Sequence, residues 1–136
     1  AAKAGARQVV AADTDLCAIA AIRLNAAANG VALSALLGDI TGGPPPEADI
    51  VLVGDLFYEE SLARRVTAFL DRCAGAGIDI LIGDPWRSFL PRGRLQLLAE
   101  YPGPDFGEND RGETKTNAVF AFRPAVISVS AAESSA

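Results

Sequence analysis

The chain of 136 residues contains no histidine and only two cysteines, Cys17 and Cys73. The lack of histidine excludes a nucleophilic triad that depends on imidazole, and it argues against a zinc site. We therefore expect no bound metal. Two cysteines do not make a disulfide framework, so we expect both to be small, buried, apolar residues in a protein of the reducing cytoplasm.

Basic stripes and long apolar runs are also missing. The 12 Lys and Arg residues are scattered among 17 Asp and Glu residues, which leaves a net charge of −5. Nucleic acid is therefore not an expected partner, because its binding needs a basic patch. No apolar run approaches the roughly 20 residues of a membrane span, so a membrane is not expected either.

The first six residues show neither an initiator methionine nor a signal-peptide pattern. They are typical of the last turn of a helix, with Gly5 as the residue that follows it. We therefore expect that a segment upstream is missing.

Apolar and charged residues are balanced as in a folded single domain, with 50% and 21% of the chain respectively. Apolar runs alternate with helical patterns, which predicts an α/β fold with helices on both faces of a mostly parallel sheet. The last strand is expected to be antiparallel, at or near an edge. The expected strands are 7–12, 31–37, 50–53, 78–82 and 116–122, with helices at 16–28, 59–76 and 93–100.

The segment around Asp55 is the strongest candidate for a functional site. Ile50 to Val53 form an apolar run rich in β-branched residues, which indicates a strand buried on both faces. Ligands of open α/β sheets bind at the carboxyl ends of the strands, where Asp55, Phe57 and Tyr58 fall. Asp55 can accept a proton or hold an amine, Tyr58 offers a hydroxyl and Phe57 an apolar wall. Alternatively, Asp55 caps the following helix.

Two further acids, Asp13 and Asp39, follow the first two expected strands. Asp13 is a candidate to accept hydrogen bonds from a pair of ribose hydroxyls, and Asp15 is expected to be the N-cap of the next helix. Asp39 could accept a hydrogen bond from an adenine amino group. The alternative for Asp39 is a loop carboxylate that caps its own backbone.

The fourth expected strand ends in Gly83-Asp84-Pro85-Trp86-Arg87. Asp84 could shape a substrate pocket and Trp86 could cover it. The alternatives are a turn acid before proline for Asp84 and a partly exposed core lid for Trp86.

Several motifs carry a resemblance to a known family. The acids Asp13, Asp39 and Asp55 resemble those of the class I S-adenosylmethionine-dependent methyltransferases. Residues 12–31 resemble the motif that follows the nucleotide loop in the protein methyltransferases of that class. Residues 55–58 match the Asp-x-x-Tyr signature of its protein-lysine methyltransferases.

Three downstream segments, at 53–59, 81–85 and 111–114, resemble the branch that methylates the electron transfer flavoprotein β-subunit. The resemblance covers residues 1–124. It implies a Rossmann-like class I methyltransferase sheet, S-adenosyl-L-methionine as cofactor and a protein substrate.

The resemblance also implies roles for the site residues. Asp13 would hold the cofactor ribose and Asp39 would approach the adenine. Asp55 and Tyr58 would line the lysine pocket as the catalytic pair. The other candidate pocket residues, Phe57, Asp84 and Trp86, follow from their positions after the expected strands; Asp84 lies in a matching motif, but the resemblance implies no specific role for it.

One departure from the family is the absence of its glycine-rich loop and first strand. In the family's sheet that strand lies between the strands placed here at 7–12 and 50–54, so the sheet must either close over the gap or have two open edges. We therefore interpret residues 1–124 as the C-terminal two-thirds of a methyltransferase domain and 125–136 as a flexible tail. We expect the isolated chain to be inactive.

Other functions stay open. A ribosomal-protein or small-molecule methyltransferase would share the motif that begins at Asp13. A Rossmann-type nicotinamide-dependent oxidoreductase would use Asp13 equally well, although the chain has no Tyr-x-x-x-Lys pair and no histidine. A non-catalytic fragment that acts as an interaction domain is the third alternative.

Overall fold

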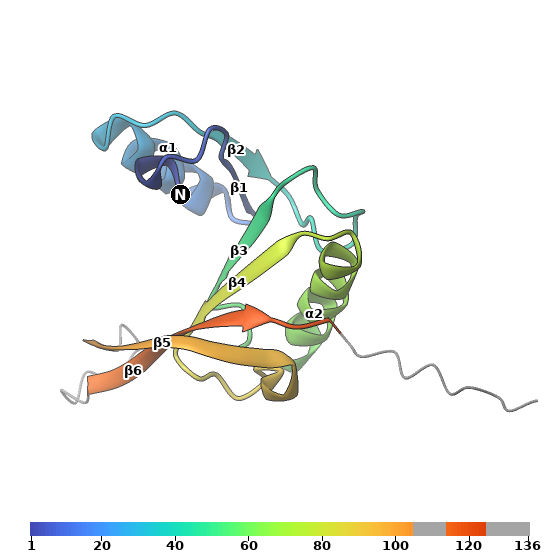
Figure 1. The fold of residues 1–136 in the computed structure, drawn as a ribbon. Coiled ribbons are helices and arrows are strands. Elements are labelled where there is room, and N and C mark those ends of the chain that lie inside the picture. Colours follow the sequence, from blue (N-terminus) through green and yellow to red (C-terminus); the bar gives the residue numbers. More distant parts are fainter. Residues whose placement is uncertain (105–113, 125–136) are drawn as a thin grey trace, which may run out of the picture. The chain divides into compact units, whose positions relative to one another are not determined.

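The computed structural model describes residues 1–104 and 114–124. The chain divides into two compact units, residues 1–42 and 43–136, whose elements are labelled in Figure 1. The predicted tail at 125–136 and residues 111–113 of the motif at 111–114 lie outside the described residues. No helix in the described part of the chain is long and apolar enough to cross a membrane.

The first unit is one βαβ segment with a short leading turn. Its elements are η1 (Ala2–Ala4), β1 (Val10–Asp13), α1 (Leu16–Ala28) and β2 (Ser34–Leu37). The strands β1 and β2 pair in parallel, as predicted, although both are shorter than expected.

Local chemistry sets the ends of the helical elements in this unit. The Asp15 carboxylate accepts the N–H of Cys17 at 2.7 Å, which confirms Asp15 as the N-cap of α1. Gly30 follows α1 with a φ of 62°, and Gly5 ends η1 with a φ of 92°. Both glycines adopt the left-handed conformation that closes a helix.

Little of the first unit is buried. Ile19 is the one buried side chain of this unit, whereas Leu16, Leu24 and Cys17 on the same helix are exposed. The prediction that Cys17 is buried is therefore wrong. Two strands of four residues cover only a narrow line of α1, so most of its apolar side chains stay in contact with solvent.

The second unit holds a four-stranded sheet and one long helix. Its elements are β3 (Ile50–Gly54), α2 (Glu60–Gly75), β4 (Asp79–Asp84), η2 (Arg92–Arg94), β5 (Leu95–Pro104) and β6 (Thr114–Phe122). The strand order is β3-β4-β6-β5. Because β3 and β4 are parallel and β6 is antiparallel to both β4 and β5, β6 alone runs against the other three. A mostly parallel sheet with an antiparallel last strand near an edge is confirmed.

The core of this unit lies between α2 and one face of the sheet (Figure 1). Burial of each large apolar side chain in such a core contributes about 1.5–3 kcal/mol. The predicted helix at 59–76 is confirmed as α2, which carries a stripe of buried apolar side chains beside a partly buried Leu62. The buried residues are Ala63, Val66, Phe69, Leu70 and Cys73 from α2, with Ile80, Ile82, Phe120 and Phe122 among those from the strands.

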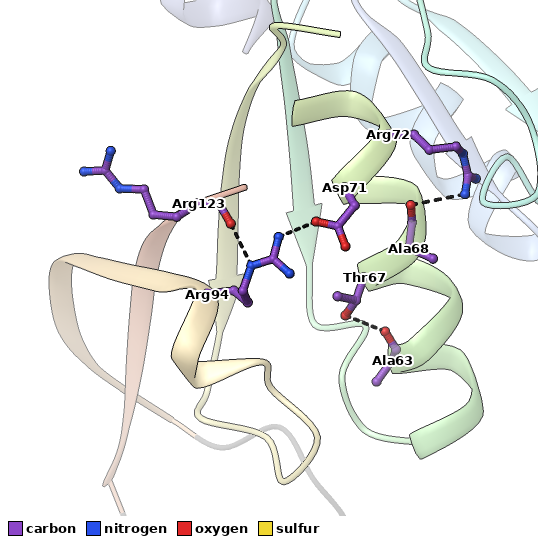
Figure 2. Close-up of polar contacts among 7 residues, drawn as sticks. All are labelled: Ala63, Thr67, Ala68, Asp71, Arg72, Arg94 and Arg123. Carbon is purple, nitrogen blue, oxygen red and sulfur yellow. Dashed lines mark hydrogen bonds and ion pairs between the residues drawn. The ribbon is translucent and has the colours of Figure 1, made fainter. Parts of the chain in front are cut away.

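Arginine contacts tie the helix to the ends of β5 and β6 (Figure 2). The guanidinium of Arg94 forms an ion pair with Asp71 of α2, and its Nε donates to the carbonyl oxygen of Arg123 at 2.9 Å. Arg72 Nη1 donates to the carbonyl oxygen of Ala68 at 3.1 Å within the helix. The Arg94 contacts join α2 to the residues that flank β5 and β6.

The helix predicted at 93–100 is wrong. This stretch is the turn η2 followed by β5, in which Leu95 and Leu97 pair with Phe122 and Phe120 of β6. Leu and Ala favour helices, but pairing with a distant strand outweighs that local preference. A register shift between Leu97 and Ala99 also interrupts the alternation that marks a strand.

The prediction that β3 is buried on both faces is also wrong. Val53 is buried, but Ile50 and Leu52 are 44% and 57% exposed. The helix α2 covers the face of Val53 and leaves the other face in contact with solvent. The second edge of β3 has no partner among the described strands, and β1 and β2 form a separate sheet. The sheet was expected either to close over the place of the missing first strand or to have two open edges. The structure has the open edges.

Candidate functional site

The loops that follow β3 and β4 lie side by side. Gly54 and Gly83 are opposite each other in the parallel register, so both loops leave the sheet at the same edge. The Asp55 N–H donates to the carbonyl oxygen of Gly83 at 3.0 Å, and the Phe89 N–H donates to that of Phe57 at 3.3 Å. The loops after β3 and β4 thus form one continuous surface at the carboxyl ends of the two strands. Ligands of α/β sheets bind at this end of the strands.

Asp55 and Arg87 form a bidentate ion pair across these loops. Arg87 Nε lies 2.7 Å from Asp55 Oδ1, and Arg87 Nη2 lies 2.8 Å from Asp55 Oδ2. Two parallel charge-assisted bonds fix the plane of the carboxylate. The two side chains are 49% and 37% exposed, so the pair remains open to an incoming group.

The alternative role of Asp55 as a helix cap does not hold. The N-cap position of α2 is occupied by Glu59, and no side chain caps that end of the helix. The carboxylate of Asp55 bonds Arg87 of the neighbouring loop instead. Arg87 was not identified as a site residue from the sequence. Its position in the loop directly after β4, which ends at Asp84, was a usable signal.

Asp84, the last residue of β4, is a buried acid with 2% of its surface exposed. Its Oδ1 accepts the backbone N–H of Arg87 at 2.7 Å, as expected of a turn acid. Its Oδ2 is buried with no hydrogen-bond partner in the described part of the chain. Burial raises the pKa of Asp84, and the negative charge of Asp55 raises it further, against the lowering effect of Arg87.

Two residues of the site have left-handed backbones. Asp55 has a φ of 50° and Trp86 a φ of 64°, the only positive values for non-glycine residues among the described positions. Such conformations are strained for a residue with a bulky side chain and cluster at functional sites. The Trp86 ring is held edge to face against Phe120, with centroids 4.8 Å apart, and its Nε1 donates to Glu100 at 3.1 Å.

The neighbours of Asp55 have contrasting positions. Tyr58 is 58% exposed, so its hydroxyl is available at the surface. Phe57 is fully buried in the core cluster, where it anchors the loop between β3 and α2. A role of Phe57 and Trp86 as walls of a substrate pocket stays a prediction.

The two acids predicted to hold a nucleotide both lie in the first unit. Asp13 ends β1, and its Oδ1 accepts the N–H of Asp15 at 2.8 Å. Asp39 follows β2, and its Oδ1 accepts the N–H and hydroxyl of Thr41 at 2.8 and 2.6 Å. Because β1 and β2 are parallel, both acids lie at the carboxyl edge of that sheet. The site acids thus form two groups, one in each unit.

Among the residues that the structure describes, no group of three or more His, Cys, Asp or Glu side chains could hold a metal ion. The loops that follow β3 and β4 carry the carboxylates of Asp55 and Asp84, the guanidinium of Arg87 and the phenol of Tyr58. A carboxylate and a phenol oxygen can orient an amine by accepting its hydrogen bonds.

Curated relatives share sequence with most of this chain. The electron transfer flavoprotein beta subunit lysine methyltransferase of Rattus norvegicus is 35% identical over 126 residues, which cover 88% of this chain and 49% of that protein. The protein of the same name from Danio rerio is 32% identical and covers 87% and 48%. The chain therefore spans about half the length of the curated relatives it matches. The resemblance found in the sequence is confirmed, although no family model matches.

Solved structures share the fold. The Pyrococcus abyssi tRNA (uracil-54, C5)-methyltransferase, in complex with S-adenosyl-L-homocysteine, matches with a TM-score of 0.60 at 18% identity, over 88% of this chain and 30% of that one. TehB from Haemophilus influenzae matches with a TM-score of 0.54 at 16% identity, over 85% and 50%. At such identities the likeness concerns the fold, and the predicted Rossmann-like methyltransferase fold is confirmed.

Proposed function

We propose that this chain is part of an S-adenosyl-L-methionine-dependent protein-lysine methyltransferase whose substrate is the electron transfer flavoprotein β-subunit. The observation that carries the proposal is the position of the Asp55-x-x-Tyr58 motif. It follows β3 directly, on a loop fixed to the end of β4, with both polar side chains exposed. The names of the relatives support the lysine acceptor and the protein substrate.

The acids of the first unit fit the cofactor. Carboxylate oxygens accept hydrogen bonds from ribose hydroxyls and from an adenine amino group, and Asp13 and Asp39 present them at the edge where nucleotides bind. Each carboxylate is oriented by one local hydrogen bond or more to its own loop. When bound, S-adenosyl-L-methionine supplies the methyl group on a sulfonium, ready for displacement.

Asp55 and Tyr58 orient the acceptor amine in this proposal. Only a neutral amine attacks, and a lysine with a pKa of about 10.4 requires about 4–5 kcal/mol to lose its proton at pH 7. The two side chains accept hydrogen bonds from the amine and align its lone pair, which is the protein's main contribution to an in-line displacement. The proton leaves to water before the attack.

A methyl-transfer assay tests this proposal. The full-length protein, meaning the proposed methyltransferase that contains this chain, is incubated with radiolabelled S-adenosyl-L-methionine and recombinant electron transfer flavoprotein β-subunit. The labelled residue is located by peptide mass spectrometry. Label on a lysine of the β-subunit is the expected result. Absence of transfer by the full-length protein, or label on another residue type, would overturn the proposal.

A control variant keeps the assay specific to the site. Asp79 lies at the amino end of β4, is exposed and is remote in register from Asp84. Asp79→Asn should leave transfer unchanged, because it removes one acid without touching the two loops. The 136-residue chain is assayed in parallel, and we expect it to be inactive, since it spans only about half the length of the relatives.

A further inference from the structure

An acid beside the acceptor amine creates an electrostatic problem. A free carboxylate at Asp55 stabilises the protonated form of any amine that it binds, which opposes the loss of the proton required for attack. The structure places a guanidinium on that same carboxylate, with both oxygens engaged at 2.7 and 2.8 Å. The acid therefore does not act as an isolated negative charge.

We propose that Arg87 is a positioning residue of the amine site, whose guanidinium neutralises Asp55 so that a lysine amine held there can exist without its proton. This inference rests on the proposed lysine methylation. Arg87 touches neither the amine nor the methyl group in this scheme. It acts through Asp55, by its charge and by fixing the plane of the carboxylate.

The geometry allows Arg87 and an amine to share the carboxylate. An ionised carboxylate has about four lone-pair sites, and the bidentate contact with Arg87 uses one on each oxygen. The remaining sites can accept an N–H of the substrate, because half of the Asp55 side chain is exposed. Arg87 does not have to leave before the amine binds.

The position of Arg87 is built into its turn. The buried carboxylate of Asp84 accepts its N–H at 2.7 Å, and its carbonyl oxygen accepts the N–H of Leu90 at 3.2 Å. The preceding Trp86 has a left-handed φ of 64° and packs against Phe120. A strained backbone that is held by a buried acid and an aromatic contact indicates a constraint on where the guanidinium lies.

Other charged and titratable groups surround the pair. Asp84 interacts electrostatically with both Asp55 and Arg87. Tyr58 and Glu59 follow Asp55 on the same loop, and Arg92 and Glu100 both contact the ring of Trp86. Arg92 and Glu100 carry opposite charges, as do Asp55 and Arg87. Without Arg87, the acids Asp55 and Asp84 lose the guanidinium that lies between the two loops.

The test is the pH dependence of turnover in the full-length protein. In Arg87→Gln, the pH at which kcat reaches half its maximum should increase by about one pH unit. The reason is that an uncompensated Asp55 stabilises the ammonium form of the substrate. The loss should therefore be about tenfold at every pH below the pKa of the bound amine and should shrink only above that pKa, so the measurements extend beyond the value of about 10.4 for a free lysine. Arg87→Lys keeps a positive charge and should recover part of the shift.

Arg64→Gln is the matched control. Arg64 also belongs to an ion pair, with Glu60 on α2, and is 78% exposed. Its loss should leave the pH profile unchanged. Equal loss of kcat at every pH in Arg87→Gln would mean a structural role and would overturn the inference. So would an unchanged profile with a lower KM, which would mark Arg87 as a competitor of the amine.

A second measurement does not require activity. The guanidinium of Arg87 lowers the pKa of Asp84, against the effect of burial. In Arg87→Gln, carboxyl ¹³C titration by NMR should therefore show the pKa of Asp84 raised further than in the wild type. An unchanged value would overturn the inference even if the wild type transferred no methyl group. Absence of transfer by the wild type at every pH would overturn the proposed function instead.

Discussion

Asp84 and Arg87 close the turn after β4 through a hydrogen bond from the Arg87 N–H to the buried carboxylate, at 2.7 Å. The other oxygen of Asp84 is buried without a partner in the described residues. The acid is thus held in a place where its ionised form is poorly stabilised. This relationship has a measurable effect on the stability of the fold.

Replacement of Asp84 by Asn should change how stability depends on pH. Burial raises the pKa of Asp84 in the folded protein above the value of about 3.9 for an unfolded Asp. Between these two values the folded state binds more protons than the unfolded state, so the contribution of Asp84 to stability falls as pH rises through that window. Asn has no such contribution.

Urea unfolding at about pH 4 and at pH 7 checks this prediction. The free energy of unfolding of the wild type, relative to Asp84→Asn, should be lower at pH 7. Asp79→Asn, at the exposed opposite end of β4, is the control. A relative stability of the wild type that rose with pH would contradict the prediction.

Asp55→Asn should reduce turnover about 100-fold, because a misplaced acceptor amine loses its alignment with the methyl group. Asn tolerates the left-handed φ of 50° at this position, so the variant tests charge and not backbone strain. The affinity for S-adenosylhomocysteine, measured by calorimetry in the full-length protein, should change little. Losses of similar size in turnover and affinity would show that Asp55 does not act on the amine.

Asp13→Asn should weaken S-adenosylhomocysteine binding about tenfold or more, since hydrogen bonds to a charged acceptor contribute about 1.5–3 kcal/mol. The amide oxygen can still accept the Asp15 N–H, so the local turn survives. Asp15→Ala is the comparison, because Asp15 caps α1 without being a candidate ligand. It should destabilise the protein by about 1 kcal/mol and leave the affinity intact. Unchanged affinity in Asp13→Asn would remove Asp13 from the cofactor site.

Leu70→Ala should destabilise the protein by about 2–5 kcal/mol, because Leu70 is completely buried between α2 and the sheet. The smaller side chain leaves a cavity that the surrounding core fills only in part. Leu98→Ala, on the exposed side of β5, is the control and should have little effect. Similar losses in the two variants in urea unfolding would contradict the assignment of the core.

Features set by neighbouring residues were predictable from the sequence. The buried stripe of α2, the N-cap at Asp15 and the left-handed Gly30 each depend on residues within a few positions. They follow from helical periodicity and from the backbone preferences of Asp and Gly. The carboxyl-end positions of Asp13 and Asp55 followed equally well from the apolar runs before them.

Features set by distant pairing were not predictable. β5 is a strand because β6 pairs with it, while its own Leu and Ala residues favour a helix. The contact of Arg87 with Asp55 depends on the register of β3 against β4, which brings Gly54 opposite Gly83. The exposure of Leu52 depends on how many helices cover the sheet. Sequence patterns indicate the secondary structure that a segment prefers by itself. These three features depend instead on the distant segments with which it packs or pairs.

The near absence of buried side chains in residues 1–42 bears on the hydrogen exchange of this chain. Ile19 is the one buried residue there, and a parallel pair of four-residue strands with one helix does not fold stably by itself. Amide protons of β1 and β2 should therefore exchange through frequent local opening. Those of β4, which pairs on both sides and carries Ile80 and Ile82 into the core, should exchange only when the second unit unfolds. The unit that carries Asp13 and Asp39 should thus exchange more slowly when a ligand is bound to it.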